Sequence, residues 1–197
     1  AGAAPLLCAG ITLYSPLKHW QVGPGKKVAI LGLGGLGHMG VKFSVAMGAE
    51  TYVLGHSPAK ASDAKEFGAK EYLITSEAFE THKNSFDVII NTTSADLDVD
   101  ALLKMLRIGG SLVNVGLPGT RQSYDPFSVV VGLKSIAGAN TGNMKDTQEM
   151  LDFCGEHNIV STIELLDASD PAAIDTAYSR VVGSDVRYRF VIDASTI

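Results

Sequence analysis

The glycines of Gly32-x-Gly34-x-x-Gly37 constrain the fold most, because they separate a short apolar run from an amphipathic stretch. The run 28–31 predicts a buried strand, and the apolar spacing over 36–47 predicts a helix. In such a turn the first glycine permits a tight bend, the second lets a pyrophosphate approach the backbone, and the third lets the helix pack close to the strand. The pattern favours dinucleotide binding, while a methyl donor on a similar turn stays open. The candidate cofactor-binding residues of this turn are Gly32, Leu33, Gly34, Gly35, Leu36 and Gly37.

From Lys27 onward, Val- and Ile-rich runs alternate with longer amphipathic stretches, which is typical of βα units on a parallel sheet. Gly48, Gly68 and Gly109 stand where the C-caps of the intervening helices are expected. We therefore expect an α/β fold with a doubly wound, six-stranded parallel sheet of the Rossmann type. The expected strands are Lys27–Leu31, Thr51–Leu54, Glu71–Ile74, Asp87–Ile90, Ser111–Val115 and Lys134–Ala137.

Three segments are expected along the chain. Residues 1–26 hold a lead-in helix over 3–20 and a connection, and residues 27–158 form the dinucleotide-binding domain, which ends with a helix at Met144–His157. Residues 159–197 predict strand, helix and strand, with Asp170 as the helix N-cap. These last elements are expected at Thr162–Leu166, Pro171–Val182 and Arg187–Asp193.

Charge and composition exclude several classes of function. The net charge is −5 and the basic residues are scattered, so no basic stripe is available for nucleic acid. No apolar run reaches the roughly 18 to 20 residues of a membrane span. Cys8 and Cys154 are far apart and form no CxxC pair, which indicates a reducing compartment. We expect a soluble, cytoplasmic protein, and the start without Met or a signal pattern predicts a piece of a longer protein.

The residues after the second expected strand indicate which nucleotide binds. NAD-selective sites carry an Asp or Glu there, which hydrogen-bonds the adenosine ribose. This chain instead has the segment 55–60, Gly-His-Ser-Pro-Ala-Lys, without a carboxylate. The Ser57 hydroxyl and the Lys60 cation suit a phosphate dianion, which favours NADP. The structural alternative is that Ser57 caps a helix and Lys60 is a solvated lysine.

Several motifs together resemble the medium-chain, zinc-containing alcohol dehydrogenases, and within them the cinnamyl alcohol dehydrogenase-like branch, which includes fungal NADPH enzymes of broad specificity. The resemblance covers essentially the whole chain. It rests on the sequences APLLCAGIT from Ala4, GLGGLGHMGVK from Gly32, NMKDTQEM from Asn143 and DVRYRFVIDA from Asp185.

The resemblance implies roles for individual residues. Cys8 resembles the third protein ligand of the family's catalytic zinc, and Thr12 resembles a contact of the nicotinamide cofactor. The segment Gly55, His56, Ser57 and Lys60 is similar to a Ser-Ser-Ser-x-x-Lys phosphate clamp, of which this chain keeps Ser57 and Lys60. The positions similar to the nicotinamide side of the family's site are Thr92, Gly116, Ala139, Asn140 and Thr141.

The resemblance further implies a zinc-dependent alcohol dehydrogenase or aldehyde reductase, which transfers hydride between NADP(H) and a primary alcohol or aldehyde. A catalytic zinc needs three protein ligands, and only Cys8 stands here, because the family's other ligands belong to an N-terminal domain. We therefore expect the chain alone to bind NADP(H) without turnover. A non-catalytic nucleotide-binding or interaction module is the alternative, and a methyltransferase is the third.

Two surfaces are expected to need partners. In the family, the segment from about Ser161 packs on the N-terminal domain, so Ile163, Leu165, Val191 and Ile192 are expected to be partly uncovered. This predicts a partner chain, an altered fold of the segment or poor solubility. The sixth strand, Lys134–Ala137, is expected at a sheet edge and predicts a homodimer.

Overall fold

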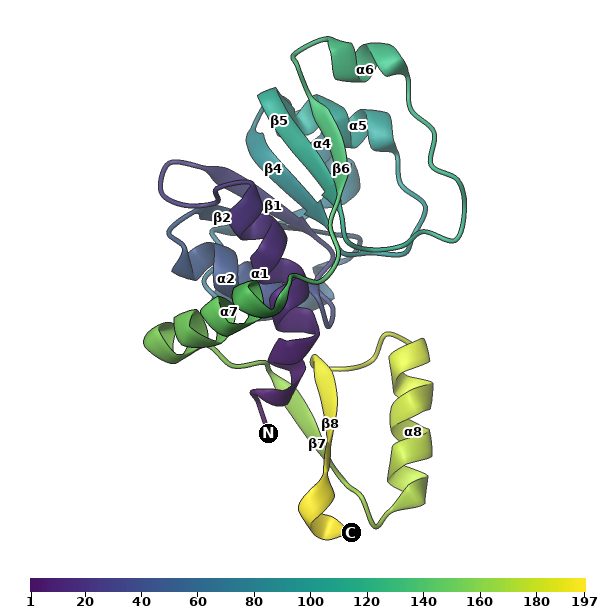
Figure 1. Cartoon of the computed structure of the whole chain (residues 1–197). Coiled ribbons are helices and arrows are strands. Elements are labelled where there is room, and N and C mark those ends of the chain that lie inside the picture. The colour runs from purple at the N-terminus through teal and green to yellow at the C-terminus, as the bar shows by residue number, and fades with distance from the viewer.

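The sheet that organises this protein is six-stranded and parallel, with the strand order β3-β2-β1-β4-β5-β6 (Figure 1). The computed structural model describes residues 1–197. Strand order reverses between β1 and β4, which gives the doubly wound fold that the sequence predicts. The strands are β1 (Lys27–Leu31), β2 (Glu50–Gly55), β3 (Glu71–Ile74), β4 (Phe86–Asn91), β5 (Leu106–Asn114) and β6 (Ser135–Gly138).

Helices cover both faces of the sheet, and alternate strand residues point into two apolar clusters. In β1, Val28 and Ile30 enter one cluster, and Ala29 and Leu31 enter the other. Because both faces are covered, the central strands are almost continuously apolar. The first face carries α1 (Ala9–His19), α2 (Gly37–Ala46), α3 (Ala61–Glu66) and α7 (Met144–His157), and the second carries α4 (Thr75–Thr81) and α5 (Val99–Met105).

Several local predictions were wrong. The lead-in is not one helix, because η1 (Ala4–Leu7) is a 3-10 turn and Cys8 interrupts the helical backbone before α1. The short helices α4 and α6 (Pro126–Val130) were not predicted, because a helix of one or two turns leaves little periodic signal. Gly109 caps no helix: α5 ends at Met105, and Gly109 lies in β5, where its N–H donates to the Gly132 carbonyl at 2.7 Å.

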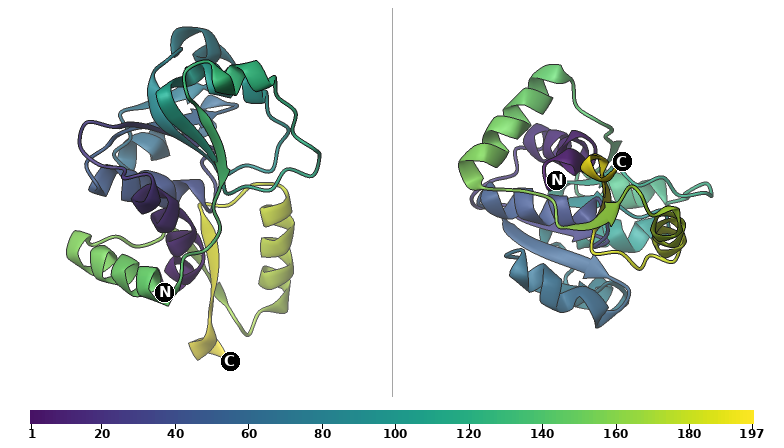
Figure 2. Two further views of the ribbon diagram at one scale, coloured as in Figure 1. Left: turned by 45° about the horizontal axis from the view of Figure 1, so that its top comes forward. Right: turned by 90° about the horizontal axis from the view of Figure 1, so that it is seen from below.

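The C-terminal tail, residues 159–197, forms a small unit of its own. Its strands β7 (Ile163–Asp167) and β8 (Arg189–Asp193) pair in parallel, and α8 (Pro171–Val182) connects them. The Asp170 side chain accepts the first N–H groups of α8, as an N-cap does. In Figures 1 and 2 this unit, in yellow-green and yellow, projects beyond the six-stranded sheet. As expected, its apolar residues are partly uncovered, with Leu165 54% and Ile192 50% exposed.

A buried histidine joins the tail to the glycine turn, residues 32–37. The Nδ1 atom of His38 lies 3.2 Å from the Gly34 carbonyl, and Nε2 lies 3.0 Å from the Ser161 hydroxyl. Since a carbonyl only accepts, Nδ1 carries the proton and Nε2 accepts from Ser161. The His38 ring also stacks on Tyr188, with centroids 5.0 Å apart. Burial lowers the pKa of His38 to about 3, so the ring is neutral when the tail is docked.

This histidine predicts an acid-sensitive fold. In the unfolded chain His38 titrates near its ordinary pKa of about 6.5, so between that value and about 3 the unfolded state binds the extra proton. The stability from neutral His38 is therefore present above about pH 6.5, and is lost at up to about 1.4 kcal/mol per pH unit as the pH falls. The free energy of unfolding in urea should fall between about pH 7.5 and about pH 5, and it should fall less in His38→Gln than in the unmodified chain.

His19→Gln is the matched control, because the His19 ring is exposed. It should keep the pH dependence of the unmodified chain. An equal loss of unfolding free energy in His38→Gln and in this control would contradict the assignment.

Candidate functional site

The carboxyl ends of β1, β2 and β4 meet at one edge of the sheet and position the glycine turn. The Gly32 N–H donates to the Leu54 carbonyl at 2.8 Å, which ties the turn to β2. The Thr92 hydroxyl donates to the Leu31 carbonyl at 2.9 Å, which ties the end of β4 to the end of β1. Ligands of open parallel sheets bind at such a switch point between strands.

The three glycines of the turn lie in different surroundings. A Cβ on Gly32 would lie 2.5 Å from the Thr93 side chain, and a Cβ on Gly37 would lie 1.9 Å from the Gly32 carbonyl oxygen. A Cβ on Gly34 would meet no atom within 4 Å. The first and third glycines therefore serve packing, whereas Gly34 faces open space. Helix α2 begins here without a side-chain cap, and the N-terminus of a helix favours negative charge.

A groove of about 800 Å³ opens above the turn, between the strand ends and the tail. Its walls are the glycine turn, the segment 55–60 after β2, the segment 92–95 after β4, and the segment 183–187 of the tail. A neighbouring pocket of about 400 Å³ shares Gly34, Lys60, Thr92 and Ser184 with it, so the two lie side by side. The combined groove has mixed polar and apolar walls, as a dinucleotide site needs.

Most of the predicted cofactor residues line this groove. They are Gly32, Leu33, Gly34, Gly35, Leu36, Gly55, His56, Ser57, Lys60 and Thr92. Gly37 instead packs beneath the turn. The sequence therefore located the two segments, 32–37 and 55–60, that the fold brings together.

The remaining predicted residues lie at neighbouring strand ends. Gly116 follows β5 and packs against the Thr93 backbone, which a Cβ would approach to 2.0 Å. The segment 139–141 follows β6, and the Ala139 N–H donates to the Asn114 carbonyl at 3.0 Å. Thr12 is buried in α1, and Cys8 is exposed at the start of that helix.

Lys60 is held as a cation inside the groove. Its Nζ donates to the Leu33 carbonyl at 3.0 Å and lies 5.2 Å from the centre of the Tyr188 ring. Burial lowers the pKa of Lys60, and the neighbouring Arg187 guanidinium lowers it further. Because burial and a neighbouring cation both disfavour its charge, Lys60 would be stabilised by an anion.

Sequence reasoning missed two arginines of the groove. Arg187 lines the larger pocket, and Arg189 lines the smaller one, where its Nε donates to the Gly35 carbonyl at 3.1 Å. Both belong to the DVRYRFVIDA sequence, which identified a family but suggested no role for them. No local pattern could have found them, because their partners lie at the other end of the chain.

Tyr72 also escaped prediction, and it explains the glycine at position 55. Its hydroxyl donates to the Ser57 carbonyl at 2.7 Å and so supports the segment 55–60. A Cβ on Gly55 would lie 1.8 Å from that hydroxyl oxygen. A side chain at position 55 would therefore have to displace the Tyr72 hydroxyl.

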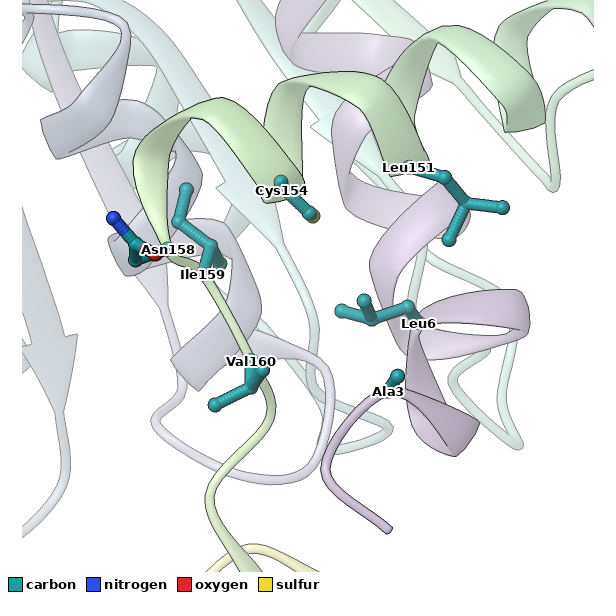
Figure 3. Close-up of a pocket in the computed structure, with 8 residues that line it drawn as sticks. Ala3, Leu6, Leu151, Cys154, Asn158, Ile159 and Val160 are labelled. Carbon is teal, nitrogen blue, oxygen red and sulfur yellow. The ribbon is translucent and has the colours of Figure 1, made fainter.

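A second pocket, of about 370 Å³, lies between the C-terminal part of α7 and the start of the chain (Figure 3). Leu6, Leu151 and Ile159 make it largely apolar. Its one titratable side chain is Cys154, and burial raises the pKa of that thiol to about 11. A protonated, buried thiol is a poor nucleophile and a poor metal ligand, so this pocket carries no chemistry.

Comparison with known proteins gives consistent relatives. A family model described as "Zinc-binding dehydrogenase" matches residues 35–156. A probable formaldehyde dehydrogenase from Bacillus subtilis is 56% identical over 197 residues, which are 99% of this chain and 56% of the relative. The NADP-dependent alcohol dehydrogenase C of Mycobacterium bovis is 50% identical, with the same coverage of both chains. The chain therefore spans about half the length of the curated relatives it matches.

Solved structures show the same relationship. A cinnamyl alcohol dehydrogenase from Sorghum bicolor superimposes with a TM-score of 0.93 at 40% identity, covering 98% of this chain and 55% of the other. A cinnamyl alcohol dehydrogenase from Helicobacter pylori, complexed with NADP(H), gives a TM-score of 0.87 at 41% identity and the same coverage.

In this chain no helix combines the length and the apolar character that crossing a membrane requires.

The close approach of Tyr72 to Gly55 predicts a strong coupling between the two positions. Gly55→Ala should lower the free energy of unfolding by about 1–3 kcal/mol, because the new methyl group overlaps the Tyr72 ring. In a Tyr72→Leu background the same substitution should cost less, because the shorter side chain leaves room. Gly119→Ala is the control, since its Cβ would meet no atom within 4 Å. Additive effects in urea unfolding would contradict the contact.

Proposed function

The chain belongs to the zinc-binding dehydrogenase family, and on that premise we propose that it is the NADP(H)-binding part of an alcohol dehydrogenase or aldehyde reductase. The observation that carries the proposal is the groove, in which the open position at Gly34 and the cation Lys60 lie together. The substrates would be primary alcohols and aldehydes, of the cinnamyl type or of broader aliphatic and aromatic kind. The names of the relatives support these classes.

The residues present fit an NADP(H) molecule. Gly34 leaves room for the diphosphate at the start of α2, where the helix N-terminus favours negative charge. Arg189, beside Gly35, adds a cation at the same place. Ser57 and Lys60 suit the phosphate on the adenosine ribose, and no carboxylate follows β2 in the segment 55–60 to repel it.

When bound, the nicotinamide ring would supply the hydride that the reaction exchanges. We assign the ring to the strand ends beyond the glycine turn, at Thr92, Gly116 and the segment 139–141. Gly116 lies against the Thr93 backbone, and the Ala139 N–H donates to the Asn114 carbonyl at the end of β5. Ile11, next to Thr12, packs against Gly142, so α1 lies against this segment. These residues would orient the ring and exclude water from one side of it. The diphosphate contacts would fix the distance between the ring and the adenosine.

The zinc implied by the family does not fit the residues of this chain alone. Cys8 is exposed at the start of α1, and the structure holds no group of three His, Cys, Asp or Glu side chains that could bind a metal. A catalytic zinc needs three protein ligands and an open position. We therefore propose that these 197 residues bind NADP(H) without turnover. We keep residues 27–158 as the nucleotide-binding domain and residues 159–197 as part of a catalytic domain.

A nucleotide-binding module without chemistry is the second candidate, supported by that incomplete ligand set. Both candidates use the same groove. Once the missing zinc ligands are supplied, the dehydrogenase part would turn over substrate and the module would not.

A cytoplasmic location stays a prediction, consistent with the free thiols of Cys8 and Cys154.

Coenzyme titration tests the proposal directly. NADPH should bind more tightly than NADH, and S-adenosylmethionine should not bind, in a fluorescence or melting-shift titration. Lys60→Ala should weaken NADPH binding roughly 10- to 100-fold, the loss of a charge-assisted hydrogen bond, with Lys65→Ala, at an exposed position, as the control. Adding zinc and a cinnamyl-type aldehyde should leave the NADPH absorbance unchanged. Turnover would contradict the binding-only assignment, and equal affinity for NADH would contradict the assignment of NADP(H).

We also propose a homodimer through β6, which lies at the edge of the sheet. Ile108 and Leu133, near the start of that strand, are 79% and 78% exposed and would be covered by a second copy. Sedimentation should show a dimer that Leu133→Glu converts to a monomer. A strictly monomeric unmodified chain would rule this interface out.

A further inference from the structure

The wall of the groove that faces the segment 55–60 comes from the tail, and it carries a second cation. Lys60 Nζ lies 5.2 Å and Arg187 Cζ 5.9 Å from the centre of the Tyr188 ring. Both side chains line the same pocket, together with Ser57. Two cations from distant parts of the chain therefore share one aromatic ring at the end of the groove assigned to the adenosine.

Arg187 is anchored on one side only. Its Nε pairs with the Asp63 carboxylate at 2.8 Å, and its Nη2 reaches the Ala59 carbonyl only at 3.5 Å. Asp63 is held in turn by the Tyr188 hydroxyl. The guanidinium has five N–H donors in a planar fork, and its side chain is 44% exposed, so donors are left for a ligand.

The charges around the groove favour an anion at this place. Burial and the Arg187 charge both lower the pKa of Lys60, so the two cations repel each other. Nearby carboxylates are already engaged: Asp63 by Arg187, and Asp185 by Arg180 at 3.3 Å. A phosphate dianion between the cations would relieve the repulsion and accept from both.

We propose that Arg187 is a specificity-determining residue, which binds the adenosine-ribose phosphate of NADP(H) together with Lys60. The inference rests on the proposed function and extends it, because it makes the tail part of the coenzyme site. The fork of Arg187 supplies donors from the tail, on the wall of the groove that faces the segment 55–60.

The competing explanation is that Arg187 serves only its ion pair with Asp63, which lies at a partly exposed site. Such a pair contributes little to stability, so a purely structural role predicts a small loss of affinity that is the same for every coenzyme. A role in phosphate binding predicts a loss confined to NADP(H). The ratio of the NADPH and NADH dissociation constants therefore separates the two explanations.

The test measures both dissociation constants for the full chain by fluorescence titration. Arg187→Gln should weaken NADPH binding roughly 10-fold or more and NADH binding less than about 2-fold. Arg187→Lys should fall between, because it keeps the charge and loses the fork. Arg121→Gln, an exposed arginine outside the pockets described, should change neither constant. Melting temperatures of all variants identify any that fail to fold. If Arg187→Gln fails to fold, the ratio of the two dissociation constants in Arg187→Lys decides between the explanations.

Each outcome is decisive. Equal weakening of NADPH and NADH, or no weakening of NADPH, would overturn the role of Arg187. If the unmodified chain binds NADPH and Lys60→Ala loses it while Arg187→Gln does not, the proposed function stands and only this inference fails. If the unmodified chain binds no NADPH, both fall.

Discussion

The packing of Tyr188 onto His38 is the contact on which the site depends, because it joins the tail to the helix that begins at the glycine turn. The Tyr188 ring is almost fully buried, and it also meets Phe67 edge-on at 5.5 Å. Burying an aromatic ring of this size contributes a large apolar area, and the stacked geometry adds to it. Its hydroxyl is satisfied by Asp63, so the ring is fixed at both ends.

That contact determines where the cations lie. Arg187 and Arg189 flank Tyr188 in the sequence. Because Tyr188 is buried against the first face of the sheet, both arginines are brought to the groove. Lys60 lies over the same ring from the segment after β2. The glycine turn gives the backbone surface, and the tail gives much of the positive charge. In the site that we propose for the dinucleotide, the two contribute together.

The sequence predicted the elements with strong local signals. The limits of α7 and α8 were correct, because each has full helical periodicity and a side-chain N-cap, Asn143 and Asp170. The doubly wound, parallel sheet followed from the alternation of apolar runs and helices. The prediction that Gly109 caps a helix was wrong. Glycine adopts a positive φ easily wherever the chain needs one, and Gly109 has a φ of 75° within β5.

The parts of the site that depend on contacts between distant segments were not predictable in the same way. Nothing in the residues around Tyr72 indicates that its hydroxyl fills the space above Gly55, and nothing near Arg187 indicates that it faces Lys60. These contacts arise only when the sheet and the tail are assembled. The glycine pattern and the residues after β2 indicated two sides of the groove from the sequence alone, and the packed structure added the third side.

A crystal structure of the chain soaked with NADPH is the most direct test of this account. It should place the diphosphate over the backbone of Gly34, and the adenosine-ribose phosphate between Lys60 and Arg187, with Tyr188 still stacked on His38. A groove without coenzyme, or one filled by side chains of the protein's own tail, would contradict it.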